Sequence, residues 1–401
     1  MAQNTNHIQT THAGSLPRSE RLQKANRDRR TGSLSEEDFQ SLLSEEVKNV
    51  VTQQVEIGLD IVNDGEFGHA MGQAVDYGAW WHYSFARTGG LELLKEGNPA
   101  TEIFRSTPGN LKYTTFADRR DWVRFQDFYD TEIETGNDPD SQFPVATSEI
   151  SYIGQNAVAS DTSNLNAAIQ ATGAKGGFVA ALSPGSAARV GNKHYATDKE
   201  FLFAWADVLK EEYKAIIDAG LTVQIDDPSI AEGWDQINPE PSVADYLDFI
   251  QTSVDALNYA LKDLPEDKIR FHLCWGSWHG PHTTDLEFKH IAETLLSINA
   301  SAYSFEAANV RHAHEWKEWE NIDLPSGKII IPGVVSHSTN VVEHPELVAQ
   351  RIEQFASVVG KENVVASTDC GLGGRIHPDI AWAKLRSLTE GAKIASGRLF
   401  N

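Results

Sequence analysis

The chain has 401 residues and a formal net charge of −23, from 34 Lys and Arg against 57 Asp and Glu. Such an acidic chain is a poor partner for nucleic acid, which needs clustered cations, and no apolar run approaches the roughly 20 residues that span a bilayer. Because no signal-peptide pattern opens the sequence, we expect a cytoplasmic protein whose two cysteines stay reduced, with neither nucleic acid nor membrane as a partner.

Hydrophobic periodicity predicts strands and helices that alternate along most of the chain. Apolar runs typical of strands centre near residues 9, 62, 179, 223, 271, 304, 331 and 366. Amphipathic patterns typical of helices cover residues 36–58, 163–171, 197–219, 242–263, 285–298, 345–359 and 378–396. A helix is expected after every strand except the second. This order predicts an α/β fold, a (β/α)8 TIM barrel, as a single domain over residues 1–401.

Residues 76–150 interrupt the alternation. The segment is rich in Trp, Tyr, Phe and turn residues, and we interpret it as a β-rich insertion or lid after the second strand. Its aromatic side chains could cover a substrate. A small satellite core explains them equally well.

Polar residues gather at the predicted strand ends, where the active site of such a barrel lies. They are Ser15, Glu66, Ser183, Asp226, His272, Cys274, Glu306, His337 and Cys370. His272 and Cys274 are two positions apart on one strand, so both point to the same face. Together with Cys370 and Glu306 they could form a shell of sulfur, nitrogen and oxygen ligands, which selects zinc.

Each of these features has a simpler explanation when it is taken alone. A single His-x-Cys on a strand is more often part of a core, and an isolated cysteine is usually a small buried apolar residue. Both cysteines of the chain stand at strand ends, however, and one of them is paired with a histidine. This combination favours a metal site. The rival histidine ligands, expected in loops or helices, are His279, His282, His290, His312, His314 and His344.

The first strand ends in the small-residue turn Ala13-Gly14-Ser15. Exposed backbone N–H groups and a hydroxyl in such a turn suit a carboxylate ligand. An ordinary turn between a strand and a loop is an equally good interpretation.

Several short motifs, in order along nearly the whole chain, resemble those of one enzyme family. They are His12-Ala13-Gly14-Ser15-Leu16-Pro17-Arg18, Asp64-Gly65-Glu66, Gln224-Ile225-Asp226-Asp227-Pro228, His272-Leu273-Cys274-Trp275, Phe305-Glu306-Ala307 and Thr368-Asp369-Cys370-Gly371-Leu372. The family is that of the catalytic barrel of cobalamin-independent methionine synthase. Its single-barrel branch includes epoxyalkane:coenzyme M transferase.

The resemblance implies a Zn²⁺ ion held by His272, Cys274, Glu306 and Cys370. It implies that Gly14, Ser15 and Glu66 hold the amino-acid part of a thiol substrate, that Asp226 contacts its amino group as a catalytic and binding residue, and that His337 matches the histidine proposed to protonate the leaving group.

The implied function is that of a zinc-dependent methyl- or alkyltransferase with a small-molecule thiol and an alkyl donor as partners. A free thiol has a pKa of roughly 8.5, and its thiolate is the nucleophile. Zinc would activate the thiol, expected to be homocysteine, as a zinc thiolate after displacement of Glu306 or a water. Attack on a donor such as a methylated folate would then give a thioether, methionine.

Departures from the family pattern leave the donor open. The full-length synthase has an additional N-terminal barrel, for which we expect no room here, and Asp226-Asp227-Pro228 replaces the usual Asp-Glu-Pro. One alternative is the transfer of an epoxide or another alkyl group to a small thiol such as coenzyme M, whose sulfonate Arg18 could bind. Others are a metal-free barrel similar to uroporphyrinogen decarboxylase, or a zinc- or thiol-binding barrel without turnover. The chain could also form a homo-oligomer.

Overall fold

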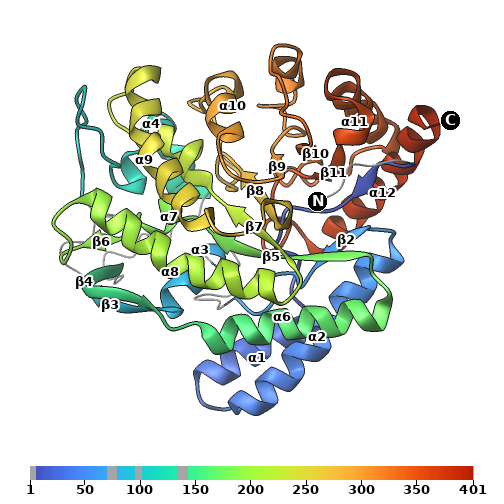
Figure 1. Cartoon of the computed structure of the whole chain (residues 1–401), viewed down its shortest axis with the longest axis horizontal. Coiled ribbons are helices and arrows are strands. Elements are labelled where there is room, and N and C mark those ends of the chain that lie inside the picture. The colour runs from blue at the N-terminus through green and yellow to red at the C-terminus, as the bar shows by residue number, and fades with distance from the viewer. Residues whose placement is uncertain (1–5, 70–78, 95–101, 133–142, 401) are drawn as a thin grey trace.

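The structure, a computed structural model, describes residues 6–69, 79–94, 102–132 and 143–400. Its centre is a parallel sheet surrounded by helices (Figure 1). The strands are β1 (Gln9–Thr10), β2 (Ile61–Asn63), β5 (Gly176–Leu182), β7 (Thr222–Asp226), β8 (Ile269–Leu273), β9 (Ala302–Phe305), β10 (Ile329–Val335) and β11 (Val365–Thr368). They coincide with the apolar runs from which strands were predicted.

The sheet is an almost closed barrel. Its strand order is β1-β11-β10-β9-β8-β7-β5-β2, with parallel pairing throughout. The two end strands meet through Asp60 N, which donates to Thr10 O at 3.1 Å, and through the Thr11 hydroxyl, which donates to Ile61 O at 3.2 Å. The predicted (β/α)8 barrel is therefore confirmed.

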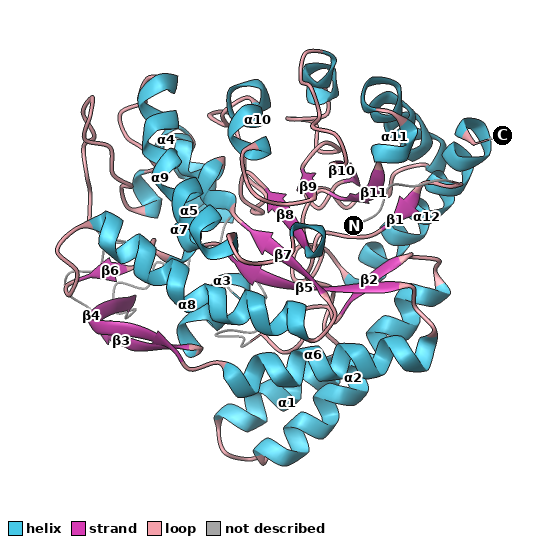
Figure 2. Ribbon diagram, viewed as in Figure 1, coloured by secondary structure: helices cyan, strands magenta, loops and turns pink. Residues whose placement is uncertain are grey.

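Helices form the outer layer of the barrel (Figure 2). The α-helices that follow the barrel strands are α1 (Glu20–Arg30), α2 (Glu36–Glu56), α6 (Gln155–Thr172), α7 (Pro184–Ala187), α8 (Asp198–Asp218), α9 (Val243–Leu261), α10 (Phe288–Leu296), α11 (Pro345–Val359) and α12 (Pro378–Leu399). Short 3-10 helices are η3 (Phe116–Asp118), η4 (Pro228–Ile230), η5 (Glu232–Trp234), η6 (Glu266–Lys268), η7 (Glu315–Glu320) and η8 (Lys361–Asn363). None of the described helices is both long and apolar enough to cross a membrane.

The helices differ from the prediction in three places. The helix α1 was not predicted, and α6 begins at Gln155, well before the expected residue 163. Between β9 and β10 the described chain forms only the 3-10 helix η7. Helix α1 has few buried apolar residues, Leu22 and Ala25 among them, so its amphipathic pattern is weak.

The described part of residues 76–150 contains both helices and strands. Its helices are α3 (Ala79–Ala86), α4 (Arg120–Arg124) and α5 (Gln126–Glu132). Strands β3 (Thr88–Leu94) and β4 (Phe143–Tyr152) pair antiparallel, and β4 pairs with the short β6 (Gly191–Asn192) in a second sheet. Residues 76–78, 95–101 and 133–142 of the expected insertion lie outside the described residues, and its role as an insertion or lid stays a prediction.

A buried arginine fills part of the barrel interior and links its strands. Arg270 on β8 is fully buried, and its guanidinium lies 3.9 Å from the ring centroid of Phe178 on β5. It donates hydrogen bonds to the Thr11 hydroxyl at 3.1 Å and to His12 O at 2.8 Å. These bonds fix the chain just before the turn at residues 13–15.

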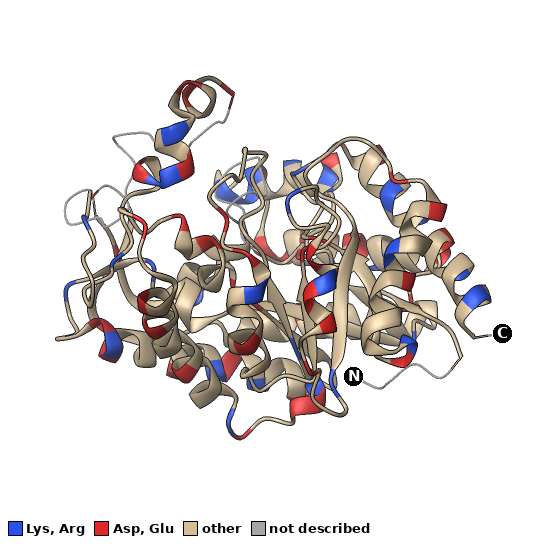
Figure 3. Ribbon diagram, turned by 90° about the horizontal axis from the view of Figure 1, so that it is seen from above, with Lys and Arg blue, Asp and Glu red and all other residues tan. Residues whose placement is uncertain are grey.

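Charged residues of both signs are mixed along the chain. In Figure 3, Lys and Arg are scattered among Asp and Glu.

Candidate active site

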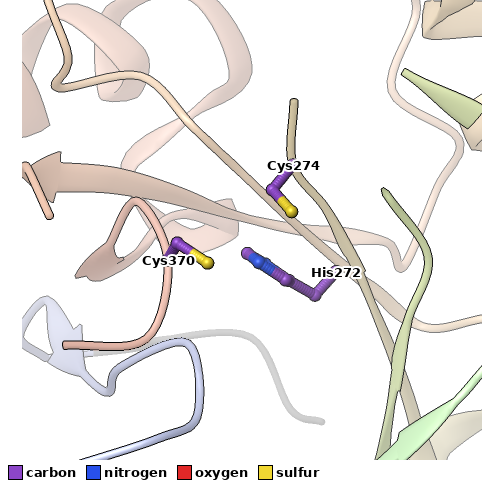
Figure 4. A group of neighbouring side chains, drawn as sticks. All are labelled: His272, Cys274 and Cys370. Carbon is purple, nitrogen blue, oxygen red and sulfur yellow. The ribbon is translucent and has the colours of Figure 1, made fainter. Parts of the chain in front are cut away.

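Two sulfur atoms and an imidazole meet at the carboxyl end of the barrel. His272 is on β8, Cys274 follows that strand directly, and Cys370 follows β11. One potential ligand atom from each of these residues lies within 4.8 Å of the others (Figure 4). Strands β8 and β11 are not neighbours in the sheet, so closure of the barrel brings these side chains together.

The imidazole of His272 is oriented as a metal ligand would be. Its Nδ1 lies 3.0 Å from the hydroxyl of Ser304, which is opposite His272 in the β8–β9 register. Among the described residues, its buried Nε2 has no hydrogen-bond partner. A buried polar atom without a partner is costly, whereas a ring nitrogen held on one side and free on the other is typical of metal-bound histidine. This donor set therefore fits a zinc ion.

The two sulfur atoms lie within 4.8 Å of each other. Interaction with the Cys370 thiol and burial raise the pKa of Cys274 well above its usual range, and the negative charge of Cys370 adds to the effect. Interaction with Cys274 lowers the pKa of Cys370 against burial, with help from His272. Metal binding requires the thiolate, so both sulfurs must lose their protons to hold an ion.

Glu306 belongs to a second group, with His337 and Asp369, whose ligand atoms also lie within 4.8 Å of one another. All three residues are buried. Burial and the charge of Asp369 raise the pKa of Glu306 to about 8, and the charge of Cys370 contributes in the same direction. The two groups adjoin, because Trp275 N, next to Cys274, donates to Glu306 Oε1 at 2.9 Å. Glu306 does not, however, lie within the group that the other three predicted ligands form.

His337 lies at the end of β10 and is 1% exposed. Burial lowers the pKa of His337 to about 3, so the ring is neutral at neutral pH. Its Nδ1 has no hydrogen-bond partner among the residues that the structure describes. The ring therefore retains hydrogen-bonding capacity beside the predicted ligands.

Asp369 was not among the predicted site residues. Its carboxylate accepts hydrogen bonds of 2.7 Å from the backbone N–H groups of Ala307, Ala308 and Asn309. The approach requires a glycine at position 333, where a Cβ would lie 2.1 Å from Asp369 Oδ1. Asp369 thereby joins the segment after Glu306 to the segment that carries Cys370. The available signal in the sequence was an acidic residue directly before a cysteine at a strand end.

The turn at Gly14 and Ser15 packs against Glu66. Gly14 has a φ of 137°, and a Cβ there would lie 2.3 Å from Glu66 Oε1, so only glycine permits this approach. Ser15 O accepts hydrogen bonds from the backbone of Leu372 at 2.8 Å and Gly373 at 3.0 Å, in the loop after Cys370. Arg18 donates from Nη2 to Glu66 O at 2.6 Å. The structure thus brings four of the five residues predicted for the thiol substrate, Gly14, Ser15, Arg18 and Glu66, together beside the loop that follows Cys370.

Asp226 at the end of β7 connects this turn to the predicted metal ligands. It is opposite His272 in the β7–β8 register. Gln224 Nε2 donates both to Asp226 Oδ1 at 2.7 Å and to Ala13 O at 2.9 Å. Burial raises the pKa of Asp226 to about 7, although His272 opposes this shift. Ser183, by contrast, caps the short helix α7 through its hydroxyl.

Several of the rival histidines have structural partners, His279, His290 and His344 as well as the two described next. His312 lies between Asp285 and Glu315, at 3.1 and 2.7 Å, and stacks on Trp275 with ring centroids 3.9 Å apart. His282 contacts the other oxygen of Asp285 at 3.2 Å. Although burial opposes it, these acidic partners raise the pKa of His312 to about 10. This network holds the loop that follows Cys274.

Comparison with known proteins places these features in a family. A family model described as the catalytic domain of cobalamin-independent synthase matches residues 8–79 and 143–394. The two ranges contain every predicted site residue. They leave out residues 80–142, which overlap the expected insertion.

Individual relatives are distant but extend over nearly the whole chain. The uncharacterised protein YxjH of Bacillus subtilis is 24% identical, over 94% of this chain and 92% of that protein. A methionine synthase of Sulfolobus acidocaldarius is 23% identical, over 98% of this chain and 93% of that protein. A 5-methyltetrahydropteroyltriglutamate–homocysteine methyltransferase of Thermotoga petrophila is 24% identical, over 96% of this chain and 44% of that longer protein.

A solved structure has the same fold. The B12-independent methionine synthase from Shewanella sp. W3-18-1, in complex with selenomethionine, superposes with a TM-score of 0.70. The alignment covers 98% of this chain and 99% of that one at 19% identity, which is a likeness of fold alone.

Proposed function

The chain belongs to the family of the cobalamin-independent synthase catalytic domain, and we propose that it is a zinc-dependent methyltransferase that converts homocysteine to methionine. The observation that carries this proposal is the convergence of His272, Cys274 and Cys370 within 4.8 Å. Two thiolates and an imidazole favour zinc over magnesium or calcium. Glu306 is the proposed fourth and exchangeable ligand.

Zinc, when bound, would lower the pKa of the substrate thiol and keep the resulting thiolate reactive. The remaining tasks fall to the side chains of the chain. Glu66 and Asp226 would accept hydrogen bonds from the ammonium group of an amino-acid thiol. The turn at Gly14 and Ser15 would receive its carboxylate. A substrate held in this way would have its sulfur directed towards His272, Cys274 and Cys370.

Methyl transfer forms a sulfur–carbon bond and breaks the bond between the methyl carbon and a nitrogen of the donor. The electron pair of the broken bond stays on that nitrogen, which must then take up a proton. We propose His337 for this delivery. Because burial keeps the ring neutral, it would donate its N–H proton to the donor nitrogen and take up the replacement proton on its other ring nitrogen from water.

The proposed alkyl donor is a methylated folate. The alternative is an epoxide or another donor with a small sulfonate thiol such as coenzyme M. The acidic side chains of Glu66 and Asp226 favour an ammonium-bearing thiol, because a sulfonate would meet two carboxylates there. Arg18, the candidate for a sulfonate, donates to the backbone of Glu66.

The experiment is metal analysis combined with thiol binding. The wild-type protein should hold one zinc ion and bind homocysteine far more tightly than coenzyme M, whereas Cys274→Ser and Cys370→Ser should lose the metal. Ser367→Ala changes a neighbouring buried residue of β11 and is the control. A metal-free Cys370→Ser protein with full methyltransferase activity would refute the proposal. Preference for coenzyme M would support the alternative.

A further inference from the structure

The carboxylate of Glu306 is hydrogen-bonded on both oxygens, unlike the imidazole of His272. Trp275 N donates to its Oε1 at 2.9 Å. The side-chain amide of Asn309 donates to its Oε2. His272 Nε2, by contrast, has no partner within the described part of the chain. The protein thus supplies its own hydrogen bonds to the one ligand that is expected to be exchanged.

Asn309 is itself held in a single orientation. Its backbone N–H donates to Asp369 Oδ2 at 2.7 Å. Its Oδ1 accepts hydrogen bonds from the backbone of Arg311 at 2.8 Å and of His312 at 3.1 Å. Since an amide oxygen only accepts and an amide nitrogen only donates, these bonds turn Nδ2 towards the carboxylate. The donor is therefore in place before any substrate arrives.

We propose that Asn309 is a positioning residue that stabilises the carboxylate of Glu306 away from the metal and so favours its exchange for the substrate thiol. This inference rests on the proposed function. A buried carboxylate that leaves a cation is costly unless other donors receive it. Asn309 and the Trp275 N–H are two such donors, and only Asn309 can be changed by substitution.

The simpler interpretation is that Asn309 only shapes its loop through Oδ1. Asn309→Ser separates the two roles. A serine hydroxyl can accept the same local backbone N–H groups, but it is too short to reach Glu306. Asn258→Ser in helix α9 is the matched control, because the Asn258 side chain also donates and accepts at once: it donates to Ser297 O at 3.0 Å and accepts from Asn299 N at 2.8 Å.

The test uses the full chain loaded with Co²⁺, whose absorption reports an added sulfur ligand. Titration with homocysteine should give an apparent Kd about tenfold higher or more in Asn309→Ser than in wild type, the usual effect of a hydrogen bond to a charged group. Asn258→Ser should match wild type. The zinc affinity without thiol, from competition with a chelator, should be equal or higher in Asn309→Ser, which a general loss of structure would not produce.

Three outcomes would count against the inference. An unchanged homocysteine Kd in Asn309→Ser overturns it, and so does an equal effect of that substitution in a Glu306→Ala background. A wild-type cobalt protein that does not respond to homocysteine overturns the proposed function and the inference together. If Asn309→Ser does not fold, Asn309→Asp replaces it. That variant keeps both Oδ1 hydrogen bonds, and its carboxylate should weaken thiol binding further.

Discussion

Ser304→Ala tests whether the orientation of His272 matters for metal binding. The Ser304 hydroxyl lies 3.0 Å from His272 Nδ1, and both side chains are buried, with exposures of 0% and 3%. Removing the hydroxyl leaves a buried ring N–H without its partner, at a cost of about 1–3 kcal/mol. The ring N–H also lacks its partner when the metal is bound, so part of this cost weakens metal binding. We therefore expect zinc affinity to fall by about 10- to 100-fold.

The assay is competition for zinc between the protein and a chromophoric chelator at neutral pH. Ser367→Ala is the matched control, since Ser367 is also fully buried and its hydroxyl has no hydrogen-bond partner among the described residues. The reasoning is wrong if Ser304→Ala binds zinc as tightly as wild type. An equal loss in Ser367→Ala would assign the effect to the missing volume instead.

Three further predictions concern binding and stability. Gly14→Ala should weaken homocysteine binding at least tenfold in a titration, because its Cβ would lie 2.3 Å from Glu66 Oε1 at a φ of 137°; unchanged binding would show that this contact can relax. The pKa of His312 is raised to about 10 from about 6.5, so its stabilising effect is complete below pH 6.5 and is lost as the pH rises towards 10. Between pH 7 and 9 the free energy of unfolding should fall by up to about 1.4 kcal/mol per pH unit, and less steeply in His312→Gln, as urea unfolding can measure. Arg87→Met should cost about 3–5 kcal/mol in the same assay, because Arg87 pairs with two buried carboxylates at 2.6 and 2.8 Å; exposed Arg21, by contrast, should cost less than about 1 kcal/mol on the same change.

Local patterns were sufficient to predict the barrel, and they also supplied most residues of the candidate site. Strand β10, with Ile329–Val335 entirely buried, is recognisable as an uninterrupted apolar run, as expected for a strand covered on both sides. The pair His272 and Cys274 shares a face for a reason internal to one strand. Because a parallel barrel places all its strand ends at one mouth, Cys370 could be added to that pair without knowledge of any contact.

Such patterns do not predict the contacts between strands. That Ser304 lies opposite His272 depends on the register of β8 and β9, which the spacing of residues within either strand does not reveal. The hydrogen bonds between Asp369 and the segment after Glu306 depend on Gly333 of β10, because a side chain there would collide with Asp369. Hydrogen bonds of this kind join residues far apart in sequence, so only the folded chain shows them.

The sequence by itself determined the barrel and the residue types at its mouth, because periodicity and strand-end position are properties of each segment alone. The tertiary structure decided how those residues are held. It orients His272 through Ser304 and holds the two oxygens of Glu306 through Trp275 and Asn309. The physical reason is that hydrogen bonds are directional and short in range. Whether they form depends on the folded position of each partner, even for Asn309, which is only three residues from Glu306.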